Sequence, residues 1–342
     1  MYCPAPFKQL NVDQTGLITP CCYWKRDESH NIDWNLLRKK MIKNESIENC
    51  QVCYDREKLN ILSLRQELNE FYGEDKKIEL KGLEVMLSNI CNFKCVTCNS
   101  TYSSRWNNKE IVTSFEFIKK IKTDYLEKIV FAGGEPFLDV NNLYLLESIK
   151  NIQNLVVYLT TNNSKVPDER WQKSFKKCKM VNICISVDGI GEVGEFVRLG
   201  MNFERYSKNL NFWKNSFYNV KFNFVLHSLN VLNLQKTFDW HLKNFPNAVY
   251  KNEYKFDVNI LNSPNCLSLK YLPDRTKDLI RDKIKNQYFK KIIEEGLIGK
   301  FNKNLCRELI EYVWKLESDF KKLPFESSII INSISESLRK DF

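Results

Sequence analysis

Histidine is scarce in this chain, because its 342 residues include only three, His30, His227 and His241. A metal site built mainly from imidazole groups, such as a His-rich zinc or non-haem iron site, is therefore disfavoured. Long apolar segments are also missing, since no run of about 18 uncharged apolar residues occurs. The first residues, Met-Tyr-Cys-Pro, lack the basic and apolar regions of a signal peptide. We therefore expect a cytoplasmic protein that does not enter a membrane.

Cysteine, in contrast, is abundant, with 12 residues. In a reducing compartment, cysteines at short spacings bind metals or carry out chemistry more often than they form disulfides. Sulfur is then the main ligand that the chain offers. This favours zinc or iron–sulfur clusters as bound groups.

Three cysteines, Cys91, Cys95 and Cys98, lie in one short segment with no fourth cysteine beside them. A structural zinc site normally closes with four ligands, so three thiolates leave one metal position open. On a [4Fe–4S] cluster, the iron without a protein ligand can bind the amino and carboxylate groups of a small molecule. A zinc site completed by a distant fourth cysteine is the alternative.

From residue 81 onward, strand-like segments alternate with amphipathic ones. The expected strands are 82–88, 127–132, 154–161, 180–187, 219–227 and 253–260, and the expected helical segments are 99–121, 139–151, 168–177, 201–215 and 232–243. Lysine-rich helices follow from about residue 273. This pattern predicts an α/β domain over 81–262, with a parallel sheet that is open or curled into a partial barrel, and a C-terminal helical region over 263–342.

Polar residues alternate with apolar ones in three of the expected strands. Asn182, Cys184 and Ser186 share one face of the fourth strand, and further polar positions of this kind are Asn223, His227, Asp257 and Asn259. Parallel strands that are buried on both faces should be continuously apolar. We therefore expect these side chains to face a partly polar cavity.

Gly133-Gly134-Glu135-Pro136 follows the second expected strand, one β/α unit after the cysteine segment. Two glycines allow the backbone to approach a ligand closely, and the proline fixes the turn that follows. Glu135 offers an anionic acceptor for an ammonium group. Both segments come directly after a strand, at the carboxyl edge where α/β barrels carry their sites.

The spacing C-x₃-C-x₂-C followed by Gly-Gly-Glu-Pro resembles the radical S-adenosylmethionine (SAM) superfamily, over about residues 81–262. The resemblance implies a partial (β/α)₆ barrel in which a [4Fe–4S] cluster on the cysteine triad binds SAM. It also implies that the reduced cluster cleaves SAM to a 5′-deoxyadenosyl radical, which abstracts a hydrogen atom from a substrate. An external one-electron reductant of the flavodoxin or ferredoxin type would supply the electron.

The same resemblance implies further contacts with SAM. It places Ser186 and Asp188 near SAM, and Arg198 could pair with the SAM carboxylate. One position departs from the family pattern, because the residue before the third cysteine is usually aromatic and is Thr97 here.

Residues 1–80 are expected to form a small α+β domain, with two short strands around Asp13–Gly16 and a helix that ends at Gly73. The segment has little apparent apolar core, so we expect its cysteines to stabilise it by binding a metal or cluster. The spacing of Cys3, Cys21, Cys50 and Cys53 resembles the Twitch module, a truncated SPASM domain, which implies an auxiliary iron–sulfur cluster of the [4Fe–4S] type. Structural zinc is the alternative, and Cys22 could replace Cys21.

Twitch and SPASM relatives imply a peptide or protein substrate, as in the maturation of a ribosomally made peptide. Two alternatives stay open: radical modification of a nucleotide, nucleic acid or small metabolite, and a non-enzymatic zinc or iron–sulfur binding protein. The formal charge is +10, and the basic surplus lies in residues 81–342. Such a surplus suits either an anionic partner or a solvated lysine-rich surface, so a nucleic-acid partner has no further support.

Overall fold

The computed structural model describes residues 1–25, 31–58, 60–246, 249–250, 253–319 and 322–339. The chain divides into two compact units. The first unit comprises residues 1–91, 107–160 and 167–182, and the second comprises residues 92–106, 161–166 and 183–342. Among the described residues, no helix combines the length and the apolar character that crossing a bilayer requires. The division into domains at 80 and 262 stays a prediction.

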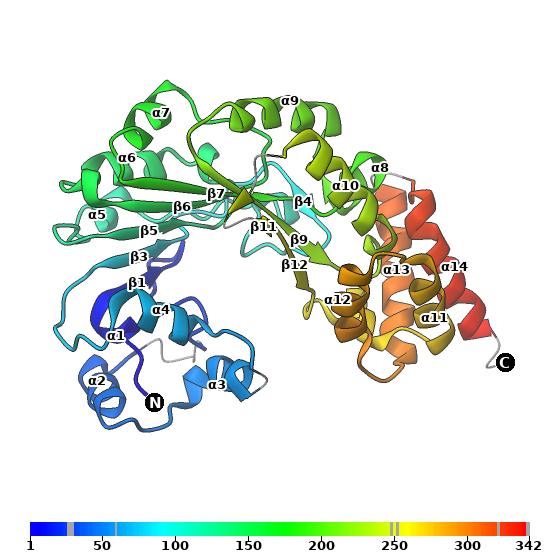
Figure 1. Cartoon of the computed structure of the whole chain (residues 1–342), viewed down its shortest axis with the longest axis horizontal. Helices are drawn as coiled ribbons and strands as arrows, with labels where there is room; N and C mark the ends of the chain where they lie inside the picture. The colour runs from blue at the N-terminus through cyan, green and yellow to red at the C-terminus, as the bar shows by residue number, and fades with distance from the viewer. Residues whose placement is uncertain (26–30, 59, 247–248, 251–252, 320–321, 340–342) are drawn as a thin grey trace. The chain divides into compact units, whose positions relative to one another are not determined.

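A mostly parallel sheet lies in the first unit, with its strands in the order β6-β5-β3-β1-β2 (Figure 1). Neighbouring strands are parallel except for β1 and β2, which form an antiparallel hairpin. The strands are β1 Gln9–Val12, β2 Ile18–Thr19, β3 Gly82–Val85, β5 Lys128–Phe131, β6 Val156–Thr161 and β7 Met180–Ser186, the last of which continues into the second unit. The predicted α/β class with a mostly parallel sheet is confirmed.

Helices α6 and α7 cover one face of β5 and β6 (Figure 1). Trp171 of α7 packs edge-on against Phe131 of β5, with ring centroids 5.8 Å apart. The strand residues on this face are buried, whereas Glu84, Lys128 and Tyr158 on the other face are half-buried. The helices of the first unit are α1 Ala5–Lys8, α2 Trp34–Ile42, α3 Gln51–Lys58, α4 Leu64–Tyr72, α5 Phe115–Ile118, α6 Val140–Ser148 and α7 Glu169–Phe175.

The N-terminal part of the first unit has an apolar core, so the expectation of a segment with little core is wrong. Its buried residues are Tyr2, Cys3, Ala5, Phe7, Leu37, Met41, Ile47 and Leu68. Four of them lie within the first seven residues and the other four lie between residues 37 and 68, so the core forms only when distant parts of the segment come together. Cys21 and Cys50 pack against this core and are partly buried.

The second unit contains β9 and β12, which are parallel, and two short antiparallel pairs, β4 with β8 and β10 with β11. Its strands are β4 Lys94–Cys95, β8 Arg198–Leu199, β9 Asn219–Leu226, β10 Val249–Tyr250, β11 Glu253–Tyr254 and β12 Phe256–Ile260. Its helices are α8 Gly191–Val197, α9 Phe203–Lys214, α10 Leu234–Asn244, α11 Asp274–Lys283, α12 Gln287–Leu297, α13 Lys303–Asp319 and α14 Phe325–Arg339. The last four are the predicted C-terminal helices.

One predicted helical segment, 99–121, is wrong. It contains a 3₁₀ turn, Ser104–Trp106, and the four-residue helix α5. The side chain of Asn99 accepts a hydrogen bond from the Thr101 backbone at 2.9 Å. Such local side-chain bonds compete with helix formation, and asparagine and serine are frequent in this segment.

The predicted polar face is confirmed in β7, where Asn182, Cys184 and Ser186 are half-buried and the residues between them are buried. His227 does not belong to this face. It lies after the end of β9 and is completely buried, with Nδ1 accepting a hydrogen bond from the Leu229 backbone at 3.2 Å. Burial lowers the pKa of His227 to about 4.

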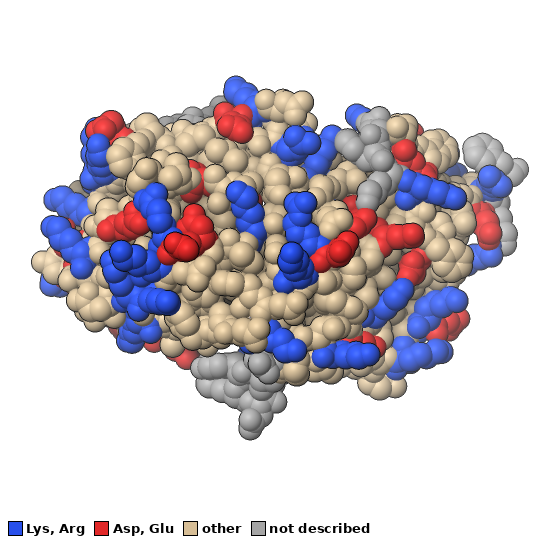
Figure 2. Space-filling model, turned by 90° about the horizontal axis from the view of Figure 1, so that it is seen from above, with Lys and Arg blue, Asp and Glu red and all other residues tan. Residues whose placement is uncertain are grey.

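Basic and acidic side chains are interspersed over the face of the molecule shown in Figure 2. Many of them form surface ion pairs; Arg281, for example, lies 3.0 Å from Glu294 and 2.8 Å from Asp278. On the face shown, this mixture favours a solvated lysine-rich surface over a basic patch for an anionic partner.

Candidate functional site

The Gly133–Pro136 turn lies against the segment that leads into Cys91. The backbone N–H of Glu135 donates to the carbonyl oxygen of Ile90 at 2.8 Å. Only glycine fits at Gly134, because a Cβ there would lie 2.1 Å from the same carbonyl oxygen. The first unit therefore holds the Gly-Gly-Glu-Pro turn directly beside Cys91.

The side chain of Glu135 is almost completely buried, with the residue 1% exposed. Its carboxylate accepts a hydrogen bond from the Phe137 backbone at 3.4 Å, at the start of the short 3₁₀ turn Pro136–Leu138. The turn thus fixes the direction of the carboxylate. A buried, oriented carboxylate is suited to binding a cation.

In the second unit, the structure brings Cys95, Cys98 and Arg198 together. Cys95 of β4 lies opposite Arg198 of β8, and the Cys98 backbone donates to the Cys95 carbonyl at 3.0 Å. The chain turns after β8 at Gly200, where a Cβ would lie 2.6 Å from the Asn92 carbonyl oxygen. The cysteine segment is therefore tightly packed against β8.

Asp188 and Arg198 form a buried ion pair, with 2.6 Å between Oδ2 and Nη1. The other carboxylate oxygen of Asp188 accepts a hydrogen bond from the Val225 backbone at 2.9 Å. In this arrangement Asp188 orients Arg198 and ties it to β9. Ser186 ends β7 and is half-buried. Contacts of these residues with SAM stay a prediction.

Replacing Arg198 with methionine should lower the free energy of unfolding by about 3 kcal/mol or more, because the Asp188 carboxylate would stay buried without its partner. Thermal unfolding of the purified variant measures this. Arg275→Met is the matched control, since Arg275 pairs with Glu336 at the surface and exposed pairs contribute at most about 1 kcal/mol. Equal destabilisation of the two variants would contradict the structural role of the buried pair.

The C-terminal helix α13 also reaches the cysteine segment. The Tyr312 hydroxyl donates to the carbonyl oxygen of Val96 at 3.1 Å. Burial raises the pKa of Tyr312, and the nearby thiols of Cys95 and Cys98 add to this effect. Nothing in the sequence around Tyr312 indicates this contact, because it joins residues that are far apart in the chain.

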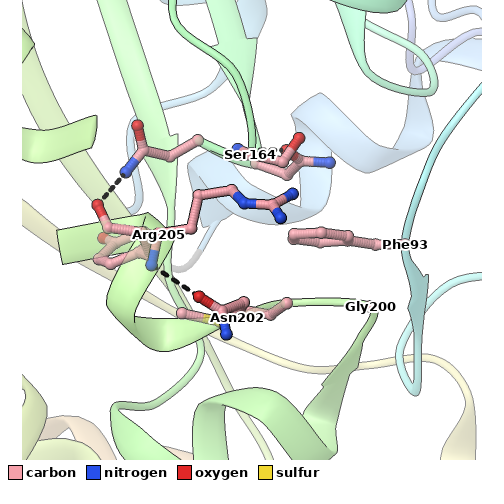
Figure 3. A pocket seen from close by; sticks show the side chains of 9 residues that line it. Phe93, Ser164, Gly200, Asn202 and Arg205 are labelled. Carbon is pink, nitrogen blue, oxygen red and sulfur yellow. Dashed lines mark hydrogen bonds between the residues drawn. The ribbon is translucent and has the colours of Figure 1, made fainter. Parts of the chain in front are cut away.

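A small pocket lies beside the cysteine segment in the second unit, and its labelled residues are Phe93, Ser164, Gly200, Asn202 and Arg205 (Figure 3). The Arg205 side chain extends toward the Phe93 ring (Figure 3). The cavity volume is about 10 Å³, which suffices for about one water molecule. The pocket is therefore too small for a nucleoside.

A second pocket, in the first unit, is lined by all four cysteines of the N-terminal set. It is enclosed by Cys3, Cys21, Cys50 and Cys53 together with Tyr23, Asn49, Val52, Leu64, Arg65 and Leu68. We name it the cysteine pocket. Cys22 does not line it, because its thiol is hydrogen-bonded to the Glu84 carboxylate.

The cysteine pocket stabilises protonated thiols as long as no metal is bound. Burial raises the pKa of Cys3 to about 12 and that of Cys50 to about 11, and raises that of Cys21 as well. A metal that binds here must displace these protons. Arg65 lies beside the pocket, held by Glu57 at 2.6 Å, and its positive charge favours bound thiolates.

Within the part of the chain that the structure describes, no three cysteine, histidine or acidic side chains lie close enough together to hold one metal ion. A single zinc ion therefore has no preformed site there. A [4Fe–4S] cluster is wider than one ion, so its cysteine ligands stand further apart. The cysteine pocket has a volume of about 20 Å³, room for about one or two water molecules, so a cluster would bind there only if the lining side chains moved apart.

Comparison with known proteins gives a family for part of the chain. The model of the "Radical SAM superfamily" matches residues 85–240. The chain is 29% identical over 149 residues to GTP 3′,8-cyclase of Campylobacter lari, covering 42% of this chain and 46% of that protein. It is 29% identical over 122 residues to 7,8-dihydro-6-hydroxymethylpterin dimethyltransferase of Methanocaldococcus jannaschii, covering 34% of this chain and 24% of that protein. The chain thus spans less than half the length of these relatives.

Solved structures give weaker matches. Native anSMEcpe with bound AdoMet has a TM-score of 0.44 at 16% identity, covering 69% of this chain and 66% of that one. Streptococcus suis SuiB bound to S-adenosylmethionine has a TM-score of 0.41 at 16% identity, covering 64% of this chain and 46% of that one. The family that the cysteine triad and the Gly-Gly-Glu-Pro turn predict is confirmed by the family model: residues 85–240 form a domain of the radical SAM superfamily of enzymes.

Proposed function

We propose that this protein cleaves SAM reductively and uses the resulting 5′-deoxyadenosyl radical to abstract a hydrogen atom from a substrate. The observation that carries the proposal is the hydrogen bond between Glu135 and Ile90, which joins the Gly-Gly-Glu-Pro turn to the residue before Cys91. Cys91, Cys95 and Cys98 would hold a [4Fe–4S] cluster. When bound and reduced by an external one-electron donor, this cluster supplies the electron that cleaves SAM.

Each of the remaining site residues has a role in this proposal. Gly133 and Gly134 let the backbone approach SAM, and Pro136 fixes the turn after them. The Glu135 carboxylate accepts a hydrogen bond from the SAM ammonium group. Arg198, which Asp188 orients, pairs with the SAM carboxylate. Ser186 lies at the end of β7, where it contacts the ribose or methionine part of SAM.

The second part of the proposal is an auxiliary iron–sulfur cluster in the cysteine pocket, held by Cys3, Cys21, Cys50 and Cys53 in a Twitch-like module. Two observations support it: all four cysteines line one pocket, and Arg65 places a positive charge beside them. Structural zinc on the same four cysteines is the alternative.

For the substrate, we propose a peptide or protein, on the resemblance of the N-terminal cysteines to Twitch and SPASM modules. A nucleotide is the second candidate. It is favoured by relatives that are named GTP 3′,8-cyclase, one of them in Mannheimia succiniciproducens at 31% identity over 115 residues.

The first test uses SAM alone. Anaerobically reconstituted protein with dithionite should release 5′-deoxyadenosine and methionine without any substrate. Glu135→Gln should weaken SAM binding about tenfold or more, because a charge-assisted hydrogen bond contributes about 1.5–3 kcal/mol. Titration with SAM under anaerobic conditions measures the affinity.

Glu116→Gln is the matched control for this test. Glu116 is exposed on α5 and pairs with Lys119, so its replacement should leave SAM affinity unchanged. If Glu135→Gln bound SAM as tightly as the wild type, the proposed ammonium contact would be wrong. Absence of deoxyadenosine from well-reconstituted wild-type protein would refute the proposed reaction itself.

A further inference from the structure

Two opposite charges lie on neighbouring strands of the first unit and on the same face of the sheet. Glu84 is on β3 and Lys128 is on β5, with Gly82 opposite Lys128 and Val130 opposite Glu84. Both residues belong to the face that helices α6 and α7 do not cover, and both are half-buried. The proposed SAM residues do not include either of them.

The ammonium group of Lys128 is held by aromatic rings. Nζ lies 5.2 Å from the centroid of the Tyr158 ring and 5.4 Å from that of Phe71. Among the described residues, it has no carboxylate or carbonyl oxygen as an ion-pair or hydrogen-bond partner. Burial lowers the pKa of Lys128, although the carboxylates of Glu67 and Glu84 oppose this effect. Among the described residues, the N–H donors of this half-buried ammonium group therefore have aromatic rings but no protein oxygen as partners.

Within the part of the chain that the structure describes, the carboxylate of Glu84 has the thiol of Cys22 as its hydrogen-bond donor. Burial raises the pKa of Glu84. Glu84 and Lys128 interact electrostatically, yet they form no ion pair within the described part of the chain. A pair of half-buried opposite charges that do not touch leaves an acceptor and a donor site side by side.

We infer that Glu84 and Lys128 bind an amide group of the substrate, with its N–H donating to Glu84 and its C=O accepting from Lys128. An anionic group would face the Glu84 carboxylate, and an ammonium group would face Lys128, so each would be partly repelled. A neutral amide satisfies both charges. The rings of Tyr158 and Phe71 would flank it.

This inference rests on the proposed function for the existence of a substrate. The same amide chemistry has two sources: a peptide, or the lactam edge of a guanine-type base. Both carry an N–H next to a C=O. The experiment therefore has one arm for each source.

The probes are guanosine and tetraglycine, each with a counterpart that lacks the amide. The counterparts are 2-aminopurine riboside and a tetraglycine analogue in which the central amide is an ester. Binding is measured by anaerobic equilibrium dialysis, at millimolar probe concentration, with reconstituted, SAM-loaded and unreduced protein. At least one amide probe should bind, and its counterpart should bind about tenfold or more weakly.

Glu84→Gln and Lys128→Met should each weaken binding of the same probe about tenfold. Lys119→Met is the matched control, because Nζ of Lys119 lies 4.6 Å from the centroid of the Phe115 ring but is solvent-exposed directly after α5. The control should bind the probe as the wild type does. The iron content of each variant shows whether it has folded. If Glu84→Gln loses iron, the binding measured with Lys128→Met is the test of the inference.

Binding in the guanosine arm alone would support the site and assign it to a nucleotide, and binding in the tetraglycine arm alone would assign it to a peptide. The inference would be overturned by failure of both amide probes, by equal binding of the counterparts, or by unchanged binding in both variants. Because SAM cleavage is assayed separately, such failures with cleavage intact would count against the amide site only.

Discussion

Replacing Cys91, Cys95 and Cys98 together with alanine should abolish 5′-deoxyadenosine release and about halve the iron content, from about eight to about four atoms per chain. The reason is that the chain offers two separate ligand sets. Cys91 lies beside the Gly-Gly-Glu-Pro turn and Cys95 lies opposite β8, whereas the other four cysteines line the cysteine pocket. Iron and sulfide analysis after anaerobic reconstitution measures the first effect, and chromatography of the dithionite reaction measures the second.

Cys178→Ala is the matched control, because this thiol is half-buried just after α7 and donates to the Ser174 carbonyl at 3.4 Å, away from both cysteine sets. It should retain the wild-type iron content and deoxyadenosine release. Four iron atoms or fewer in well-reconstituted wild type would refute the two-cluster proposal. Residual deoxyadenosine release by the triad variant would show that the SAM site lies elsewhere.

Replacing Cys50 and Cys53 with alanine should remove the auxiliary cluster and leave SAM cleavage in place. Both residues line the cysteine pocket, and neither is among the proposed SAM residues. The variant should lose about half of its iron and still release deoxyadenosine. Product formation should fail if the auxiliary cluster binds the substrate or accepts its electron. Once a substrate is known, deoxyadenosine and product are measured in one assay.

Cys22→Ser completes this experiment. Because the Cys22 thiol points to Glu84 rather than into the cysteine pocket, its replacement should leave the iron content unchanged, whereas Cys21→Ser should lower it. The reverse result would make Cys22 the ligand. Loss of SAM cleavage in a Cys50/Cys53 variant that keeps its triad cluster would contradict the separation of roles, and full product formation would reduce the auxiliary cluster to a structural element.

The sequence was sufficient for features that depend on neighbouring residues. Alternation within Met180–Ser186 correctly placed Asn182, Cys184 and Ser186 on one face, because side chains alternate along a strand. The family followed from two short motifs in their correct order. The prediction of a helix over 99–121 was wrong because the backbone of Thr101 bonds to the side chain of Asn99, and such local bonds compete with helix formation.

Features that join distant residues could not be read from the sequence. Asp188 and Arg198 were each predicted as site residues, but their ion pair with each other was not predicted. The bond from Tyr312 to Val96 spans 216 residues and has no local signal. The N-terminal core was missed for the same reason, since residues such as Phe7, Leu37 and Leu68 come together only on folding.

The pairing of β1 with β3 has a consequence for how the chain can be shortened. Residues Gln9–Val12 run parallel to Gly82–Val85 along their full length, so the N-terminal segment supplies the last strands of the first unit's sheet. A chain that began at residue 81 would leave the N–H and C=O groups of β3 without partners along that side. Bare strand edges of this kind promote association between chains. The N-terminal cysteines are therefore carried on a segment that also covers the edge of β3.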